Sequence, residues 1–204
     1  MKTTKGICRS FAVTGLSMIA VISICGCSDN GEDKSSNILQ EPEEKLTTKP
    51  SLTQQLAIAE INKLGGRINV DEKSSDKSVV LVDLNGPKVT DATLMHLKEL
   101  TKLRMLGLSR TKITDAGLVH LKGLTKLEAL GLRYNNVTDA GLVHLKGLTQ
   151  LRLLALLGAQ VTDAGLAHLN GLAQLQTLQL GGTQVTDAGV DKLKQSLPKC
   201  HITR

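Results

Sequence analysis

Leucine and other aliphatic residues recur through most of the chain in a fixed order that combines two spacings. Leu130 and Leu132 are separated by a single residue, which predicts a strand with its leucines on one face. Leu118, Leu121 and Leu124 recur three apart, which is typical of a helical stripe. Each unit of the pattern is therefore predicted to contain a strand, a turn, a short helix and a return segment.

The same order of residues returns every 24 residues. A phrase made of an aliphatic residue followed by Thr-Asp-Ala begins at Val89, Ile113, Val137, Val161 and Val185. The pattern L-x-x-L-x-L-x-x-(N/T)-x-(V/I) accompanies these copies. One unit buries too few aliphatic side chains to offset the entropy lost on ordering its backbone, so neighbouring units must stack.

This pattern resembles the leucine-rich repeat (LRR), and the Thr-Asp-Ala-Gly-Leu phrase is similar to repeats common in bacterial exported LRR proteins. The resemblance covers residues 79–204, as about five repeats with a C-terminal cap. It implies an α/β fold, a leucine-rich repeat solenoid with a parallel β-sheet on the concave side and short helices on the convex side.

The segments at the two ends of the repeats are predicted to cap the solenoid. Residues 52–78 form the N-terminal cap, with an amphipathic helix over residues 52–64 and a short strand near Arg67–Val70. At the other end, Pro198 separates a last helix from a terminal strand around Cys200–Ile202.

One position departs from the family pattern. The family commonly has Asn there, with a side-chain amide that bonds backbone groups of adjacent turns. This chain has Pro87, Thr111, Asn135, Ala159 and Thr183. Because Ala and Pro cannot replace the amide, we expect this ladder to be discontinuous or water-filled near Ala159.

Residues 1–26 have a basic start, an apolar run and a small-residue end. The apolar run is shorter than the roughly 20 residues that a membrane-spanning helix needs, so a cleaved signal peptide is predicted. The sequence Ile24-Cys25-Gly26-Cys27 resembles the bacterial lipobox, which implies cleavage after Gly26 and diacylation of Cys27. The alternative interpretation is an ordinary secretory signal with incidental cysteines.

Residues 27–51 are predicted to be the lipidated cysteine and a flexible polar linker. Besides Cys27, the lipidated mature protein would keep one cysteine, Cys200, so it could form no intramolecular disulfide. We expect this thiol to be buried as a small hydrophobic group. The predicted localisation is lipid-anchored in the bacterial cell envelope, on the periplasmic or cell-surface side.

The composition is that of a globular protein, with 41% hydrophobic and 22% charged residues. Its aromatic content is only 1%, which argues against modules that stack nucleic-acid bases or sugars on aromatic side chains. The formal net charge is +6, and Lys2, Lys5 and Arg9 at the N-terminus carry half of it. Nucleic acid is therefore not an expected partner.

The titratable residues repeat along the solenoid instead of forming one cluster. A histidine row consists of His96, His120, His144 and His168. Neighbouring helices pack about 8–10 Å apart, whereas a metal ion needs nitrogen ligands at about 2 Å, so no metal site is predicted.

The other repeated residues are given structural roles. The aspartates beside each threonine are interpreted as helix caps: Asp115, Asp139 and Asp163. The repeated glycines are expected to allow close packing of the turns: Gly117, Gly141, Gly165 and Gly189. With no catalytic grouping and no phosphate loop, neither enzymatic activity nor a cofactor is predicted.

Outward-facing strand positions are not needed for the core and can carry recognition. They form columns across the repeats, and the central column is Leu81, Met105, Ala129, Leu153 and Thr177. The concave face is thus predicted to be apolar in its centre and fringed by arginines. The candidate partner-binding residues are Arg104, Met105, Arg133, Tyr134, Arg152, Leu153 and Leu157. Arginine and tyrosine are common binding anchors, but these positions could equally be neutral filler between the leucines.

Three functions stay open at this point. The favoured one is a non-catalytic, membrane-anchored scaffold that binds a protein or peptide on its concave face. A second is a binder of an anionic cell-envelope polymer through the concave arginines Arg104, Arg110, Arg133 and Arg152. A third, ranked last, is an intracellular ubiquitin-ligase-type LRR adaptor, because the repeat phrase is similar to eukaryotic cysteine-containing repeats. Their ladder cysteine is absent here, and the export signal argues against that location.

Overall fold

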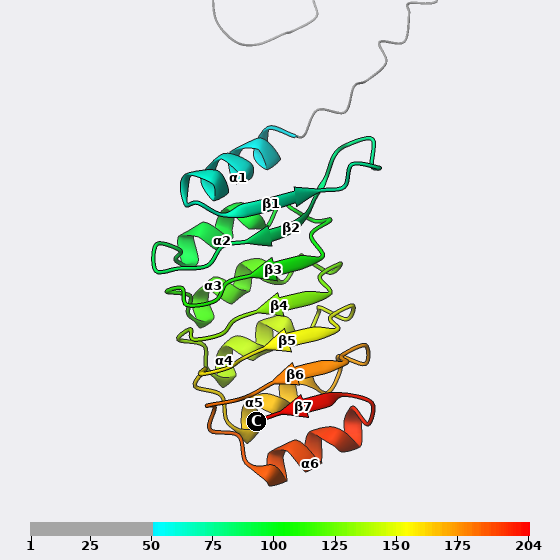
Figure 1. Cartoon of the computed structure of the whole chain (residues 1–204). Helices are drawn as coiled ribbons and strands as arrows, with labels where there is room; N and C mark the ends of the chain where they lie inside the picture. The colour runs from blue at the N-terminus through cyan, green and yellow to red at the C-terminus, as the bar shows by residue number, and fades with distance from the viewer. Residues whose placement is uncertain (1–50) are drawn as a thin grey trace, which may run out of the picture. The chain divides into compact units, whose positions relative to one another are not determined.

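The computed structural model describes residues 51–204, which belong to one compact unit. Within these residues the strands form one seven-stranded sheet in chain order (Figure 1). The first pair is antiparallel and the later pairs are parallel. The strands are β1 Arg67–Val70, β2 Val79–Asp83, β3 Met105–Gly107, β4 Ala129–Gly131, β5 Leu153–Ala155, β6 Thr177–Gln179 and β7 His201–Thr203.

The helices stack along one face of this sheet (Figure 1). The α-helices are α1 Leu52–Lys63, α2 Asp91–Leu97, α3 Asp115–Leu118, α4 Asp139–Leu142, α5 Asp163–Leu166 and α6 Asp187–Ser196. Three 3₁₀ turns follow the short helices: η1 Val119–Leu121, η2 Val143–Leu145 and η3 Ala167–Leu169. This arrangement confirms the predicted solenoid of strand, turn, short helix and return segment.

The aliphatic pattern forms the core. Leu118, Leu121, Leu124, Leu130 and Leu132 are all 0% exposed, as the pattern predicts. The three-residue spacing corresponds to an α-turn that continues as a 3₁₀ turn, not to a uniform α-helix. A 3₁₀-helix has three residues per turn, so side chains three apart lie directly above one another and face the sheet together.

A helix and a strand flank the repeats at each end. Helix α1 buries Ala57 and Ile61 against the first repeat, and β1 adds an antiparallel strand to the sheet. The terminal strand β7 begins at His201, one residue later than expected. The N–H of Cys200 donates to the carbonyl of Leu197 and closes the turn after α6, which keeps Cys200 out of the strand and its thiol buried.

The aspartates of the repeats do not cap their own helices, so that interpretation is wrong. Thr114 caps α3 by accepting a hydrogen bond from the N–H of Ala116. Asp115 instead reaches the next repeat, where its carboxylate accepts from the N–H of Thr138 at 2.8 Å and from its hydroxyl at 2.6 Å. The same two bonds join the pairs Asp91–Thr114, Asp139–Thr162 and Asp163–Thr186.

The repeated glycines make room for this Asp–Thr ladder. A Cβ on Gly141 would lie 2.3 Å from the Oδ1 of Asp115, and the other repeats show the same close approach. The equivalent position in the first repeat is Thr93, and the residue 24 positions before Asp91 is Arg67, so no aspartate fills the space. There the Thr93 hydroxyl accepts a hydrogen bond from the N–H of Thr90 at 3.3 Å.

The asparagine-type ladder is confined to one step. The Oδ1 of Asn135 accepts from the Thr111 hydroxyl at 2.6 Å, and its Nδ2 donates to the Leu108 carbonyl at 2.6 Å. The side chain of Ala159 cannot continue this ladder, and only its backbone N–H forms a hydrogen bond, to the carbonyl of Leu156. The Asp–Thr ladder spans this gap, so the stack stays connected between its third and fifth repeats.

The predicted signal peptide, Cys27 and nearly all of the predicted linker lie outside the described residues. Among residues 51–204, none of the helices is long and apolar enough to cross a bilayer.

Candidate functional site

The concave columns predicted from the sequence exist in the sheet. The register aligns Leu81, Met105, Ala129, Leu153 and Thr177 as neighbours on successive strands. Two residues further along each strand lies a second column, which has small residues in its middle: Asp83, Gly107, Gly131, Ala155 and Gln179. Small side chains next to larger ones leave a depression in the sheet surface.

That depression, here called the central hollow, has a volume of 280 Å³. Its walls come from β2 to β5 and include Leu81, Met105, Ala129 and Leu153. Met105 is 48% exposed, whereas Leu81, Ala129 and Leu153 are half-buried. The hollow is an apolar surface on the side of the sheet opposite the helices.

A second depression, the strand-end cleft, lies where the chain leaves the first strands. It has a volume of 480 Å³. The residues that line it are Asn85, Gly86, Pro87, Ser109, Arg110, Arg133 and Tyr134. Two of these are arginines and none is acidic, so the lining carries two positive charges, while the nearby Asp83 carboxylate accepts a hydrogen bond from Asn85.

One position at this edge has a left-handed backbone in every repeat. Glycine holds it at Gly86, Gly158 and Gly182, with φ values of 112°, 69° and 73°. Arg110 and Tyr134 hold it with φ values of 55° and 56°. A left-handed conformation costs a residue with a Cβ roughly 1–2 kcal/mol.

Hydrogen bonds between repeats enforce this conformation. The N–H of Arg110 donates to the carbonyl of Arg133 at 2.8 Å, and the N–H of Tyr134 donates to Leu157 at 2.7 Å. The fold therefore imposes the same backbone on arginine and tyrosine that it imposes on glycine, and both side chains are directed into the cleft lining.

The Tyr134 ring contacts the repeats on both sides. The guanidinium carbon of Arg110 lies 5.4 Å from the ring centroid, a cation–π contact. From the following repeat, a Cβ on Gly158 would lie 2.6 Å from the ring Cδ1, so the ring occupies space that a side chain there would need. Arg133 crosses one repeat to donate from Nη2 to the Oε1 of Gln179 at 2.6 Å.

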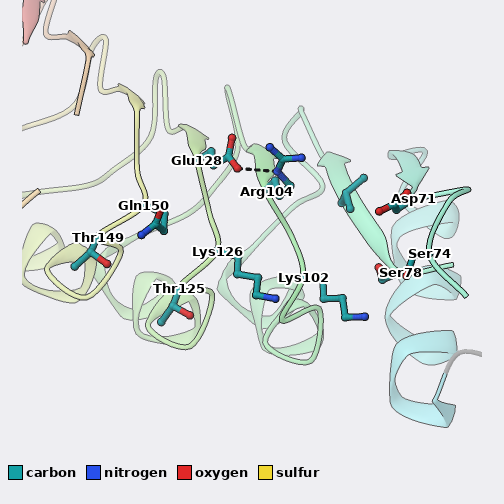
Figure 2. A pocket seen from close by; sticks show the side chains of 11 residues that line it. Asp71, Ser74, Ser78, Lys102, Arg104, Thr125, Lys126, Glu128, Thr149 and Gln150 are labelled. Carbon is teal, nitrogen blue, oxygen red and sulfur yellow. Dashed lines mark hydrogen bonds and ion pairs between the residues drawn. The ribbon is translucent and has the colours of Figure 1, made fainter. Parts of the chain in front are cut away.

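A third depression, the strand-start groove, is the largest, at 720 Å³. It lies beside the residues that precede the strands, next to the loop between β1 and β2 (Figure 2). Its lining is polar and of mixed charge: Asp71, Ser74, Ser78, Val80, Lys102, Arg104, Thr125, Lys126, Glu128, Thr149 and Gln150. Figure 2 shows Lys102 and Lys126 extending from neighbouring repeats, with the Arg104–Glu128 pair near them.

Ion pairs occupy part of this groove. The Nε of Arg104 donates to Glu128 at 2.7 Å, and this bond lowers the pKa of Glu128 and raises that of Arg104. Hydrogen bonds from the Lys102 ammonium and then from the Ser74 hydroxyl lower the pKa of Asp76 to about 2. The contact with Asp76 ties the loop between β1 and β2 to the second repeat.

Comparison with known proteins supports the architecture. A family model described as a leucine-rich repeat matches residues 123–145 and 174–194. The LRR ectodomain of the receptor kinase SOBIR1 from Arabidopsis thaliana aligns with a TM-score of 0.52 at 16% identity, covering 76% of this chain and 92% of that one. The chain has a leucine-rich repeat fold.

An internalin (inlF) from Listeria monocytogenes is also similar, at 30% identity and a TM-score of 0.47. The match covers 53% of this chain, and the chain spans only 30% of the internalin's length. A search of curated proteins finds no match. LRR domains generally serve as protein-interaction scaffolds, and structurally similar LRR proteins are typically non-enzymatic interaction domains.

The predicted binding residues of this LRR domain fall on different surfaces. Met105 and Leu153 line the central hollow, and Arg133 and Tyr134 line the strand-end cleft. Arg104 lies in the strand-start groove, paired with Glu128. Arg152 and Leu157 line none of these three depressions.

Sequence reasoning missed the strand-start groove. The signal was the recurrence of Thr-Lys before the strand leucine, at Thr101-Lys102 and Thr125-Lys126. The depth of the groove depends on the loop between β1 and β2, which follows no repeat pattern. The sequence indicates Arg110 only as one of the cations of the polymer-binding alternative, because a left-handed backbone cannot be read from its residue type.

The histidine row shows no metal-binding geometry in the described part of the chain. Among residues 51–204, no three His, Cys, Asp or Glu side chains are grouped to hold one ion. The Nδ1 of His144 is buried without a hydrogen-bond partner among these residues. Burial also raises the pKa of the Cys200 thiol.

Proposed function

We propose that this LRR domain is a non-catalytic scaffold that binds a protein or peptide along its concave face, and that a lipid on Cys27 anchors it to a bacterial envelope membrane. The general use of LRR domains in protein interaction supports the first part. The export-signal pattern of residues 1–26 and the lipobox-like end support the second.

The central hollow carries the proposal for the concave face. It combines the exposed Met105 and the half-buried Leu81 and Leu153 with polar residues on both flanks. Protein interfaces commonly have this arrangement, with an apolar centre that excludes water and a polar rim. A peptide lying across β2 to β5 would bury Met105 and Leu153.

Pairing of the arginines favours a peptide over an anionic polymer as the partner. Arg104 is bound to Glu128, and Arg133 donates to Gln179. The Glu128 carboxylate takes up the charge of Arg104, one of the four arginines on which polymer binding would depend, whereas Arg133 bonds to a neutral amide and keeps its charge. An extended polyanion would also have to cross the apolar hollow between the two edges.

Binding can be tested with random peptides displayed on phage and enriched on the purified protein. Affinities of the enriched peptides would then be compared for the wild type, Met105→Asp and Val119→Asp. Val119 is a matched control, because it is 40% exposed but lies on the convex helical side. We expect Met105→Asp to lose at least tenfold in affinity and Val119→Asp to retain it. Equal affinities would place binding elsewhere.

Anchoring can be tested separately by detergent phase partitioning of the protein produced in a bacterium. The wild type should enter the detergent phase and Cys27→Ala should stay in the aqueous phase. Recovery of both proteins in the aqueous phase would refute the lipid anchor without affecting the peptide-binding proposal.

A further inference from the structure

We infer that the strand-end cleft is a carboxylate-binding subsite, in which Arg110 and Arg133 receive an acidic group of the peptide bound on the concave face. The inference rests on the proposed function, because it names the chemistry that the partner presents at one edge of that face. It concerns a different surface from the central hollow, so the two can fail independently.

The charges of the cleft point to an anionic ligand group. Two guanidinium groups line it, and none of its seven lining residues carries a carboxylate. A guanidinium presents paired N–H donors in one plane, which match the two oxygens of a carboxylate. Arg110 stacks on Tyr134, an arrangement that orders the guanidinium while leaving its N–H edge available to a ligand.

Arginine and tyrosine are not required by the fold at this position. Gly86, Gly158 and Gly182 adopt the same left-handed conformation in other repeats, without the strain that a Cβ introduces. Arg110 and Tyr134 therefore sit in a conformation that disfavours them, next to each other and facing one cleft. Strained residues that gather in a cleft are a recurrent property of ligand-binding sites.

The position of the cleft favours a peptide carboxylate over a free anion. Ser109 and Arg133 lie two residues beyond Gly107 and Gly131, which line the central hollow. Two residues of extended chain span about 6–7 Å, so a peptide with an apolar side chain in the hollow can place a neighbouring acidic group in the cleft.

Tyr134 provides a direct reporter of this subsite. It is the only tyrosine of the chain, and the chain has no tryptophan, so its fluorescence arises at the cleft. The full-length protein would be titrated with four probes at constant ionic strength. These are N-acetyl-glutamate amide, N-acetyl-alanine with a free carboxylate, N-acetyl-glutamine amide and inorganic phosphate.

We expect a saturable change in Tyr134 fluorescence with at least one of the two carboxylates and none with the glutamine probe. The first two probes distinguish a side-chain carboxylate from a chain terminus. An equal response to phosphate would indicate a general anion site and overturn the inference. A response to the glutamine probe, or no response to either carboxylate, would also overturn it.

Two variants test the roles of the arginines. Arg110→Gly and Arg133→Gln should each weaken carboxylate binding at least fivefold, and Lys146→Gln on the convex side should leave it unchanged. Arg110→Gly introduces the residue that other repeats have at this position, so its melting temperature should not fall. Retained binding in both arginine variants would refute the assignment of the guanidinium groups.

The outcome for the central hollow is independent of these results. A fluorescence response to carboxylate together with peptide binding that ignores Met105→Asp would refute the hollow and keep the subsite. Peptide binding that depends on Met105, without any Tyr134 response to carboxylate, would refute the subsite and keep the proposed function.

Discussion

The Asp–Thr ladder and the strand-end edge both connect successive repeats. The ladder does so through aspartate side chains, and the strand-end edge through backbone hydrogen bonds at a repeated left-handed position. At the ladder, four successive steps use the same residue types, the same two hydrogen bonds and nearly the same distances. At the strand-end edge the backbone conformation repeats, but its residue changes from glycine to arginine and tyrosine. Identical residues are found where side chains make the same bonds at every step, and varied residues where the repeated feature is a backbone conformation.

This contrast explains how one solenoid can combine stability with a specialised surface. The ladder couples three residues per step, since the threonine caps a helix, the aspartate bonds the next threonine and the glycine leaves room for the carboxylate. Changing any one of them disturbs the other two. The strand-end position requires only a left-handed backbone, so its side chain can differ between repeats, and the Arg110–Tyr134 contact has no counterpart where glycine holds the position.

The largest effect is expected in the core beneath both regions. Leu130→Ala removes a side chain that is 0% exposed and should lower the free energy of unfolding by about 2–5 kcal/mol. Lys146→Ala, on the exposed convex side, should change it by less than about 0.5 kcal/mol. Urea unfolding of both variants would measure the difference, and similar values would contradict the assignment of inside and outside.

A smaller but more specific effect is expected in the ladder. Asp115→Ala removes two hydrogen bonds to Thr138 and should cost about 1–2 kcal/mol. Gly141→Ala should also destabilise, because its Cβ would lie 2.3 Å from the Asp115 carboxylate. The double variant should lose less than the sum of the two single losses, since removing the carboxylate relieves the clash. Strict additivity would show that glycine is not there to accommodate aspartate.

Asp187 provides the control for the ladder. It occupies the equivalent position in the last repeat, where its partner is Arg204 instead of a threonine of a further repeat. Its side chain is 94% exposed. Asp187→Ala should therefore leave the melting temperature nearly unchanged, and a loss as large as that of Asp115→Ala would contradict the role assigned to the ladder.

The sequence predicted the fold well because the fold follows from local pattern. Alternation around Leu130, the three-residue spacing of Leu118 and Leu121, and the caps at both ends each depend on residues close in sequence. The ladder was misinterpreted because Asp115 and Thr138 are 23 residues apart, and a capping aspartate has the same local signature. The exception at Thr93 was a usable signal, since the glycine is missing where no earlier aspartate exists.

The candidate site was less predictable than the fold. The register between the strands could be inferred from the 24-residue repeat, so the predicted column from Leu81 to Thr177 is confirmed. The depth of the surface depressions could not be inferred, because it depends on which side chains bond to one another across repeats. The Arg133–Gln179 bond spans 46 residues, and the strand-start groove depends on the loop between β1 and β2.

At the strand-end edge, replacing arginine by glycine should change the free energy of unfolding little. Arg110→Gly relieves about 1–2 kcal/mol of left-handed strain, but it adds about 0.5–1 kcal/mol of unfolded-state entropy and removes a contact with Tyr134 that contributes about 0.5–1 kcal/mol. Gly158→Ala should destabilise, because its φ is 69° and its Cβ would meet the Tyr134 ring. Thermal unfolding would measure both shifts. A loss of stability in Arg110→Gly would mean that the arginine contributes to the stack.

The smallest expected effect is at the strand-start groove, where the Lys102–Asp76 ion pair joins the loop between β1 and β2 to the second repeat. The pKa of Asp76 is lowered to about 2, below its ordinary value of 3.8, mainly by the hydrogen bond from Lys102. The stabilisation from this contact is therefore fully present above about pH 4 and is lost as the pH falls through about 2.

Carbon-13 NMR of the Asp76 carboxyl during an acid titration would report its pKa directly. Lys102→Ala should raise the midpoint toward 3.8, because it removes the hydrogen bond that lowers this pKa most. Lys126→Ala is the matched control, because Lys126 lines the same groove one repeat away and the lysine that pairs with Asp76 is Lys102. A midpoint that stays near 2 in Lys102→Ala would show that Ser74 suffices to hold the carboxylate. The loop would then be stabilised from within itself, independently of the second repeat.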